Sequence, residues 1–241
     1  MKNLFFPFLI GVFLSLNVKG AYLLMPMDAS QTDHLKAYGI TYWALTKEVP
    51  VDWLLNYRGG SFLVPHSPLI QNECLIRNVS FEVISDAQVN QLFEEIASPS
   101  SNMDVMKLEQ YPKIAVYSPK SKQPWDDAVT LVLSYAEIPY EIIFDDEIMY
   151  NELIRYDWLH LHHEDFTGQY GRFYKNYKHM PWYQQQQNEF EASAQKHGYG
   201  KVSLLKLAIA KRIKSYVASG GFLFAMCSAT DTYDIALAAE G

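Results

Sequence analysis

The chain has 241 residues, of which 49% are hydrophobic, 15% aromatic and 20% charged, and its formal net charge is −7. This composition is that of a globular protein, and the acidic balance argues against a chain that binds nucleic acid through phosphate contacts. The length suits one large α/β domain or two smaller domains.

The N-terminal segment predicts a secretory signal peptide over residues 1–20. Lys2 supplies the positive start, Leu4–Leu16 is an apolar run, and compact residues lead to a cut after Gly20. The run is short for a membrane span, so an uncleaved anchor is the alternative. We therefore expect a periplasmic or secreted protein with no stable membrane span after cleavage.

Apolar runs alternate with segments of helical period along the rest of the chain. Strands are expected over 22–27, 51–57, 79–84, 113–117, 140–144, 156–162 and 221–226, and helices over 34–47, 67–77, 126–136, 182–196 and 204–218. Ser85 predicts the N-cap of a further helix. This alternation predicts parallel pairing in a doubly wound, flavodoxin-like α/β sheet.

The looser segment 98–110 is the expected boundary between two halves. The first half, 21–100, is expected to be a βαβ unit, and the second, 111–241, an α/β unit that continues past its last residue. In such sheets ligands bind beyond the carboxyl ends of the strands, so the residues that follow each strand are the candidate site residues.

A dense group of nitrogen and oxygen donors follows one of these strands. Period-two alternation places His160 and His162 on one face of the strand, and His163, Glu164 and Asp165 follow. Glu164 or either of His162 and His163 suits general acid–base catalysis. His160, His162, His163 and Asp165 are also candidate ligands for a divalent metal ion. The alternative is a buried polar layer of hydrogen-bonded histidines.

Cys227 lies at the turn between the last strand and a following helix. A helix N-terminus favours the thiolate and can stabilise an oxyanion, so Cys227 is the candidate nucleophile. A buried small side chain is the alternative, and a disulfide between Cys74 and Cys227 is a further one. The candidate substrate-binding residues, which also follow strands or open a helix, are Asp28, Arg58, Ser228 and Asp231.

The stretches IAVYSP, AEIPYEIIFDD, YDWLHLHHEDFTG and GGFLFAMCSATDTYDIA resemble, in their order, the class I glutamine amidotransferase-like domain over residues 113–240. That resemblance implies a flavodoxin-like fold, Cys227 as the nucleophile, and an oxyanion site near the loop after Leu161. Here the turn reads AMCSA, where the family usually has Gly-x-Cys-x-Gly. The family places its catalytic His and Glu after the cysteine, which implies a base beyond residue 241.

The whole chain resembles an exported family of Bacteroidota that is commonly labelled asparagine synthetase B. DHLKAYGITYWAL, VDWLLNYRGGSFLVPHS and QPWDDAVTLVL carry this resemblance together with the two C-terminal stretches. The family runs longer than 241 residues, which implies that this chain is a C-terminally truncated fragment. The mature start at Ala21 and the missing Ser-Gly-Gly-x-Asp-Ser loop argue against literal asparagine synthesis.

The sequence thus predicts an exported amidotransferase-like hydrolase that acts on an amide or ester through Cys227. Its substrate would be a small molecule or an envelope component. No cofactor is expected, and a divalent metal ion is the alternative. The alternative is a non-catalytic or metal-dependent envelope domain that binds carbohydrate or peptide through the aromatic-rich segment 170–183. Literal asparagine synthesis ranks third.

Overall fold

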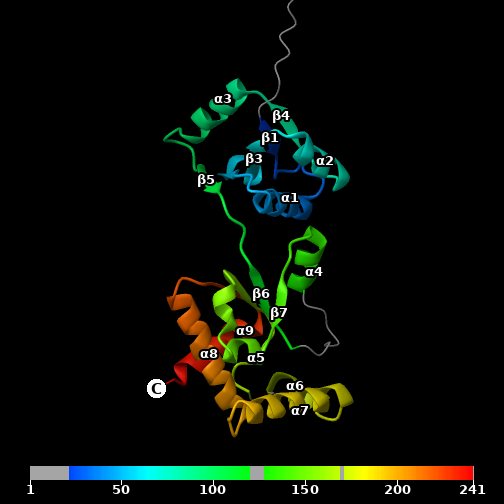
Figure 1. Ribbon diagram of the computed structural model, residues 1–241, viewed down its shortest axis with the longest axis vertical. Helices are drawn as coiled ribbons and strands as arrows, with labels where there is room; N and C mark the ends of the chain where they lie inside the picture. Colours follow the sequence, from blue (N-terminus) through cyan, green and yellow to red (C-terminus); the bar gives the residue numbers. More distant parts are fainter. Residues whose placement is uncertain (1–21, 120–127, 169–170, 241) are drawn as a thin grey trace, which may run out of the picture. The chain divides into compact units, whose positions relative to one another are not determined.

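A computed structural model describes residues 22–119, 128–168 and 171–240 (Figure 1). The predicted signal peptide and Tyr170 lie outside these residues. The chain divides into two compact units. The first contains residues 22–32 and Pro50–Lys107, and the second contains Asp33–Val49 and residues 108–240.

The first unit is built on a five-stranded sheet with the order β4-β1-β3-β2-β5. Its elements are β1 (Tyr22–Met25), β2 (Val51–Leu55), the 3₁₀ helix η1 (Tyr57–Gly59), β3 (Ser61–Pro65), α2 (Pro68–Ile76), β4 (Glu82–Ile84), α3 (Asp86–Ile96) and β5 (Asp104–Leu108). β3 pairs with both β1 and β2 in the antiparallel direction, and β4 is antiparallel to β1. The expectation of parallel pairing was wrong for this half of the chain.

The tight turn between β2 and β3 explains this antiparallel arrangement. Asn56, Arg58, Gly59 and Gly60 all have positive φ, so the chain reverses within a few residues. A Cβ on Gly59 would lie 2.4 Å from the Met27 carbonyl oxygen, which makes glycine necessary there. Arg58-Gly59-Gly60 therefore turns the chain. Neither β3 nor β5 was among the expected strands.

One face of this sheet packs on α3. Leu24, Leu54, Leu63 and Ile84 form a core cluster with Val89, Leu92 and Ile96 of the helix. The predicted cap is confirmed: Ser85 accepts from the Gln88 N–H, and the Gln88 side chain accepts from the Ser85 N–H, which is a capping box.

The second unit holds a four-stranded parallel sheet with the order β7-β6-β8-β9. Its strands are β6 (Ile114–Tyr117), β7 (Glu141–Ile143), β8 (Trp158–Leu161) and β9 (Phe222–Ala225). All four strands were expected. The chain moves from β6 to β7 on one side and continues through β8 on the other, so the topological switch point lies between β6 and β8.

Helices of the second unit pack against both faces of this sheet (Figure 1). The helices of this unit are α1 (His34–Thr46), α4 (Ala128–Ala136), α5 (Asp145–Met149), the 3₁₀ helix η2 (Glu152–Arg155), α6 (Gly171–Tyr177), α7 (Pro181–Lys196), α8 (Val202–Ala218) and α9 (Ser228–Ala238). Those that share core clusters with the strands include α4, α8 and α9, whereas α1 packs against α4. Leu159 and Leu161 face the core formed with α8 and α9, whereas Ile114 and Val116 pack with Leu133 of α4. Helices on both faces explain why these strands are apolar on both sides.

Gly39 allows α1 to approach α4 closely. A Cβ at this position would lie 1.8 Å from the Ala136 carbonyl oxygen. We expect Gly39→Ala to lower the free energy of unfolding by about 1–3 kcal/mol, because the forced separation of the helices outweighs alanine's better helix propensity. Urea denaturation measures the change. Gly200→Ala is the control, since a Cβ there meets nothing within 4 Å; equal stability of the two variants would contradict the prediction.

Candidate functional site

Cys227 sits at a strained turn between β9 and α9. It is the N-cap residue of α9, with φ 53° and ψ −139°, and it is exposed. A non-glycine residue rarely adopts this conformation, which costs on the order of 1–3 kcal/mol. Ala229 is fully buried directly behind the turn, and small neighbours of this kind allow such a tight turn. A nucleophile elbow has this geometry: a strained residue that presents its side chain between a strand and a helix.

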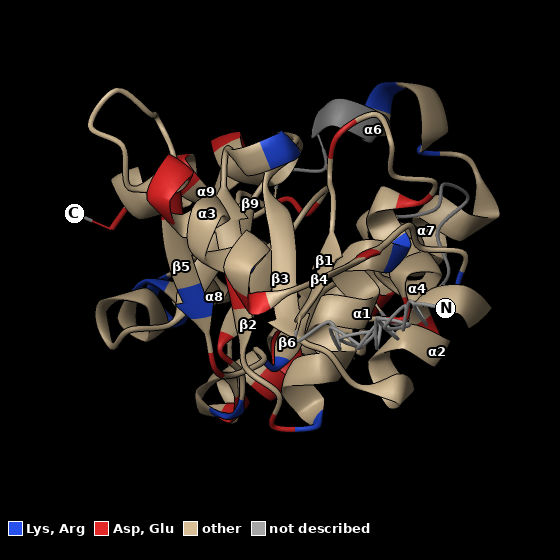
Figure 2. Cartoon of the chain, turned by 90° about the horizontal axis from the view of Figure 1, so that it is seen from above, with Lys and Arg blue, Asp and Glu red and all other residues tan. Residues whose placement is uncertain are grey.

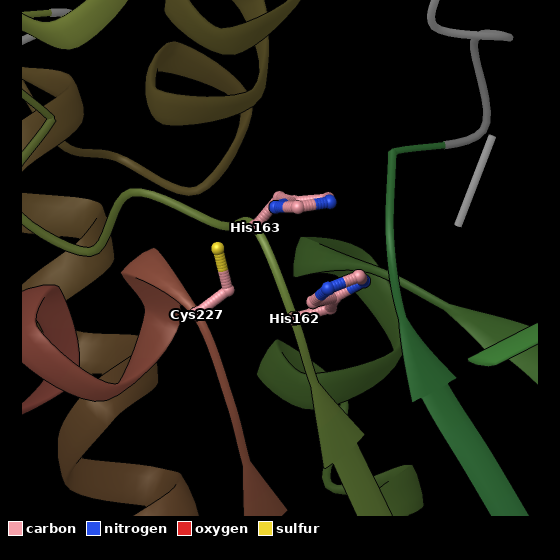
Figure 3. Close-up of side chains that lie close together, drawn as sticks. All are labelled: His162, His163 and Cys227. Carbon is pink, nitrogen blue, oxygen red and sulfur yellow. The ribbon is translucent and has the colours of Figure 1, made fainter. Parts of the chain in front are cut away.

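The structure brings His162 and His163 to Cys227. One ring nitrogen of each histidine and the Cys227 Sγ all lie within 4.8 Å of one another (Figure 3). The two imidazole rings stack with centroids 3.6 Å apart and an interplanar angle of 25°. His162 is 7% exposed, whereas His163 is partly exposed. A candidate base for Cys227 therefore lies at the end of β8.

Four hydrogen bonds fix the loop after β8 against the start of α9. The Met226 N–H donates to the Leu161 carbonyl at 3.0 Å, and the Ala229 N–H donates to the His162 carbonyl at 3.1 Å. Ser228 Oγ donates to the His163 carbonyl at 3.1 Å, and Thr232 Oγ1 donates to the Glu164 carbonyl at 2.8 Å. These bonds hold the backbone that carries the two histidines against the backbone that carries the thiol.

Glu164 and Asp165 bind backbone groups of their own loop. Glu164 Oε2 accepts from the His162 N–H at 2.8 Å. Asp165 Oδ1 accepts from the Thr167 N–H at 2.8 Å and from its hydroxyl at 2.5 Å. These contacts shape the loop that carries the histidines, so both carboxylates are positioning groups here.

His160 lies deeper on the strand than the other histidines. It is 0% exposed, its ring stacks on Phe224 at 5.7 Å, and its centroid is 6.0 Å from that of His162. The predicted alternation of the strand holds, but His160 is outside the group formed by His162, His163 and Cys227.

The remaining candidates of the second unit lie in the first turn of α9. Ser228 reaches back to the His163 carbonyl, and Asp231 is exposed in the first turn, where the helix dipole favours a carboxylate. Ser228 is therefore adjacent to the candidate nucleophile, and Asp231 lies three residues further along the same first turn.

Asp28 and Arg58 belong to the first unit, where they bind each other. Arg58 Nε lies 2.7 Å from Asp28 Oδ2, and Arg58 Nη1 lies 2.8 Å from Glu82 Oε1. The hydrogen bond from Arg58 holds the pKa of Asp28 well below its usual range, and the pKa of Arg58 is raised in turn. The contacts that this guanidinium makes are those of an ion-pair network that fixes the β2–β3 turn.

Both cysteines are free thiols, and their environments differ. Cys74 is 0% exposed, and burial raises the pKa of its thiol to about 12. Cys227 is exposed. A disulfide between them is not formed in this structure, and the contrast makes Cys227 the accessible thiol.

Sequence reasoning missed a buried charged network in the second unit. Lys206 of α8 is 2% exposed and lies 2.7 Å from Asp145 Oδ1 and 2.8 Å from the Tyr117 hydroxyl. Burial, and then the Asp145 charge, raise the pKa of Tyr117 well above its usual value. Lys206 lies on the apolar face of its helix, between Leu205 and Ile209. This position in the hydrophobic pattern was the sequence feature that could have indicated its burial.

A pocket of about 540 Å³ adjoins this network at the carboxyl end of β7. Its lining includes two aromatic side chains and several acidic ones: Phe144, Phe190, Asp145, Asp146, Glu147 and Glu189. Asp146 is paired with Lys196 and His197, at 2.6 and 2.7 Å. The pocket is therefore lined by acidic and aromatic side chains, and Lys206 neutralises the buried carboxylate of Asp145.

Charged residues are spread over the elements of the chain. Figure 2 shows Lys and Arg positions separated by Asp and Glu positions. Within the described part of the chain, no helix combines the length and apolar character that a membrane span requires.

Comparisons with known proteins add no relative to this picture. No family model, no curated protein and no solved structure matches the chain. The functional conclusion therefore rests on the geometry of Cys227 and its two histidines.

Proposed function

We propose that this chain is a class I glutamine amidotransferase-like hydrolase in which Cys227 attacks an amide or ester carbonyl and His163 is its base. The observation that carries the proposal is the exposed thiol at a strained strand-to-helix turn, with two imidazoles within 4.8 Å. Strained backbone of this kind concentrates at functional sites, because a purely structural turn would favour glycine.

A flavodoxin-like arrangement of the second unit is part of this proposal. The parallel order β7-β6-β8-β9, with helices on both faces, supports it. Cys227 and the histidines follow β9 and β8, at the carboxyl ends of adjacent strands. Ligands of doubly wound sheets bind at this edge, so the proposed fold and the proposed site agree.

The reaction proceeds in two steps. His163 accepts the proton of the Cys227 thiol, and the thiolate attacks the carbonyl carbon. The Ser228 N–H, the amide that follows the nucleophile, stabilises the oxyanion at the positive end of α9. The C–N or C–O bond breaks, and the leaving group takes the proton from His163. Water then attacks the thioester with His163 as base, releases the carboxylate and restores the thiol.

The distance between the thiol and the imidazoles is compatible with this chemistry. A separation of up to 4.8 Å exceeds a hydrogen bond, but such contacts are often long before substrate binds. His163 suits the base better than His162 because it is partly exposed and can exchange protons with substrate and water. His162 is buried, and Glu164 holds its backbone N–H.

Alkylation of the native protein tests the proposal without knowledge of the substrate. Iodoacetamide is expected to modify Cys227 rapidly and to leave Cys74 protected, with each site quantified by peptide mass spectrometry. Amide and ester substrates, glutamine among them, should slow the modification of Cys227 when they occupy the site. If Cys227 reacts no faster than buried Cys74, the nucleophile assignment fails.

Replacing His163 tests whether this residue, and not a neighbouring side chain, is the base. We expect His163→Ala to lower kcat/KM by about 10²–10⁴-fold, the range of general-base catalysis, and to slow alkylation of Cys227 at neutral pH. His179→Ala, at an exposed histidine outside the site, should leave both rates unchanged. Full activity in His163→Ala would assign the base to another residue.

The pocket beside α7 favours a second candidate, a domain that binds a small molecule. Its volume and its two phenylalanines suit an aromatic or sugar ring. Under this alternative, Cys227→Ser leaves ligand binding intact, whereas Phe190→Ala weakens it. Isothermal titration with a panel of sugars and peptides distinguishes the two candidates.

A further inference from the structure

The group His162, His163 and Cys227 has the donor set of a metal site. It offers two imidazole nitrogens and one thiolate sulfur, all within 4.8 Å of one another (Figure 3). Imidazole and thiolate together are the ligands that Zn²⁺ prefers, whereas Mg²⁺ and Ca²⁺ take oxygen ligands. The chemistry of the donors therefore points to a zinc-like ion.

The three donor atoms lie near one another but wider apart than around a bound ion, and the two stacked rings must turn for their nitrogen lone pairs to converge. With Zn–N distances of about 2.0–2.1 Å and a Zn–S distance of about 2.3 Å, three ligands of one tetrahedral ion lie about 3.3–3.6 Å apart. The donors here need to close by roughly 1 Å. Cys227 is exposed and His163 is partly exposed, so both side chains have room to rotate.

The backbone around the donors is already held in place. The four hydrogen bonds that join residues 161–164 to residues 226–232 fix the loop after β8 to the start of α9. A metal ion would thus bind to a largely preorganised site instead of ordering two mobile segments.

We propose that His162, His163 and Cys227 bind a single Zn²⁺ ion, with a fourth coordination position left to water. The donor atoms that lie within 4.8 Å of one another are those of His162, His163 and Cys227, so the ion takes three protein ligands. The ion would bind both the Cys227 thiolate and the proposed base, His163, and would therefore inhibit hydrolysis. This inhibition rests on the proposed function, whereas the metal binding does not.

Cobalt substitution tests the site directly. Metal-free full-length protein is titrated with Co²⁺, and the near-ultraviolet cobalt–thiolate charge-transfer band is followed. We expect the band to saturate at one ion per chain and to disappear when Zn²⁺ is added. Cys227→Ser should abolish the band and weaken zinc binding by at least about 100-fold, since even the loss of partners outside the ligand set costs 10–100-fold. His163→Ala should weaken zinc binding by at least about tenfold.

Matched controls distinguish this site from other thiols and histidines. Cys74→Ala and His179→Ala should keep the cobalt band, and circular dichroism verifies that every variant is folded. A wild-type protein without the band, or a band that persists in Cys227→Ser, would overturn the proposal. In wild-type protein Zn²⁺ should also protect Cys227 from iodoacetamide, a readout that needs no variant; unprotected Cys227 would contradict the proposal.

The outcomes for metal binding and for hydrolysis are separable. A zinc-displaceable cobalt band in a protein without hydrolytic activity would support the metal site and reject the proposed function. Hydrolysis that depends on Cys227, together with the absence of the band, would reject the metal site and support the function.

Discussion

Cys227→Ser is expected to lower kcat/KM for amide or ester hydrolysis by about 10³-fold or more, because loss of a nucleophile removes the covalent step itself. Serine is close in size to cysteine and sits at the same exposed turn, so the fold should be preserved. The hydroxyl is a much weaker nucleophile beside a single imidazole. Release of ammonia from amides, or of the alcohol from esters, measures the loss.

Cys74→Ala is the matched control for this variant. Cys74 is buried, and its high pKa keeps the thiol protonated, so its removal should not change kcat. If Cys227→Ser kept full activity while chelators abolished it, a metal ion at the histidines would be the catalyst, and the nucleophile assignment would be wrong.

Lys206→Met is expected to lower the free energy of unfolding by about 3–5 kcal/mol, because it leaves Asp145 as an uncompensated buried charge. Lys206 and Asp145 are 2% and 1% exposed and 2.7 Å apart. Lys206 Nζ also lies over the Phe144 and Phe190 rings, at 4.3 and 4.9 Å from their centroids. Urea denaturation followed by circular dichroism measures the change.

Lys211→Met provides the control on the same helix. Lys211 is half-exposed, and its Nζ lies 3.6 Å from Glu240 Oε1, so the variant should change stability by no more than about 0.5–1 kcal/mol. The double variant Lys206→Met/Asp145→Leu should recover most of the loss, because apolar groups replace both buried charges. Equal effects of Lys206→Met and Lys211→Met would contradict a buried ion pair.

The sequence predicted the parallel sheet of the second unit well because its strands are continuous apolar runs separated by helices. The same reasoning failed in the first unit for a specific reason. Helix-length spacing between β1 and β2 suggested a βαβ crossover, but β3 pairs between these two strands. The order of strands in a sheet depends on pairing between distant segments of the chain. The hydrophobic pattern of each segment does not reveal that order.

The residues of the candidate site could be predicted from the local sequence, but their proximity to one another could not. Cys227 and the histidines were predicted from their positions after strands, which is local information. Their proximity depends on β8 and β9 being neighbours, and 65 positions separate Ser228 from the His163 carbonyl that it contacts. Lys206 was missed because a lysine on a helix is usually solvent-exposed, and only the partner on another element explains its burial.

The positive φ of Cys227 places opposing demands on this position. Glycine would adopt φ 53° without strain, so folding alone favours a residue that has no side chain. The chemistry proposed here requires a side chain at that position. Stability and activity therefore conflict at a single residue, and a stabilised variant selected only for folding would be expected to lose its thiol first.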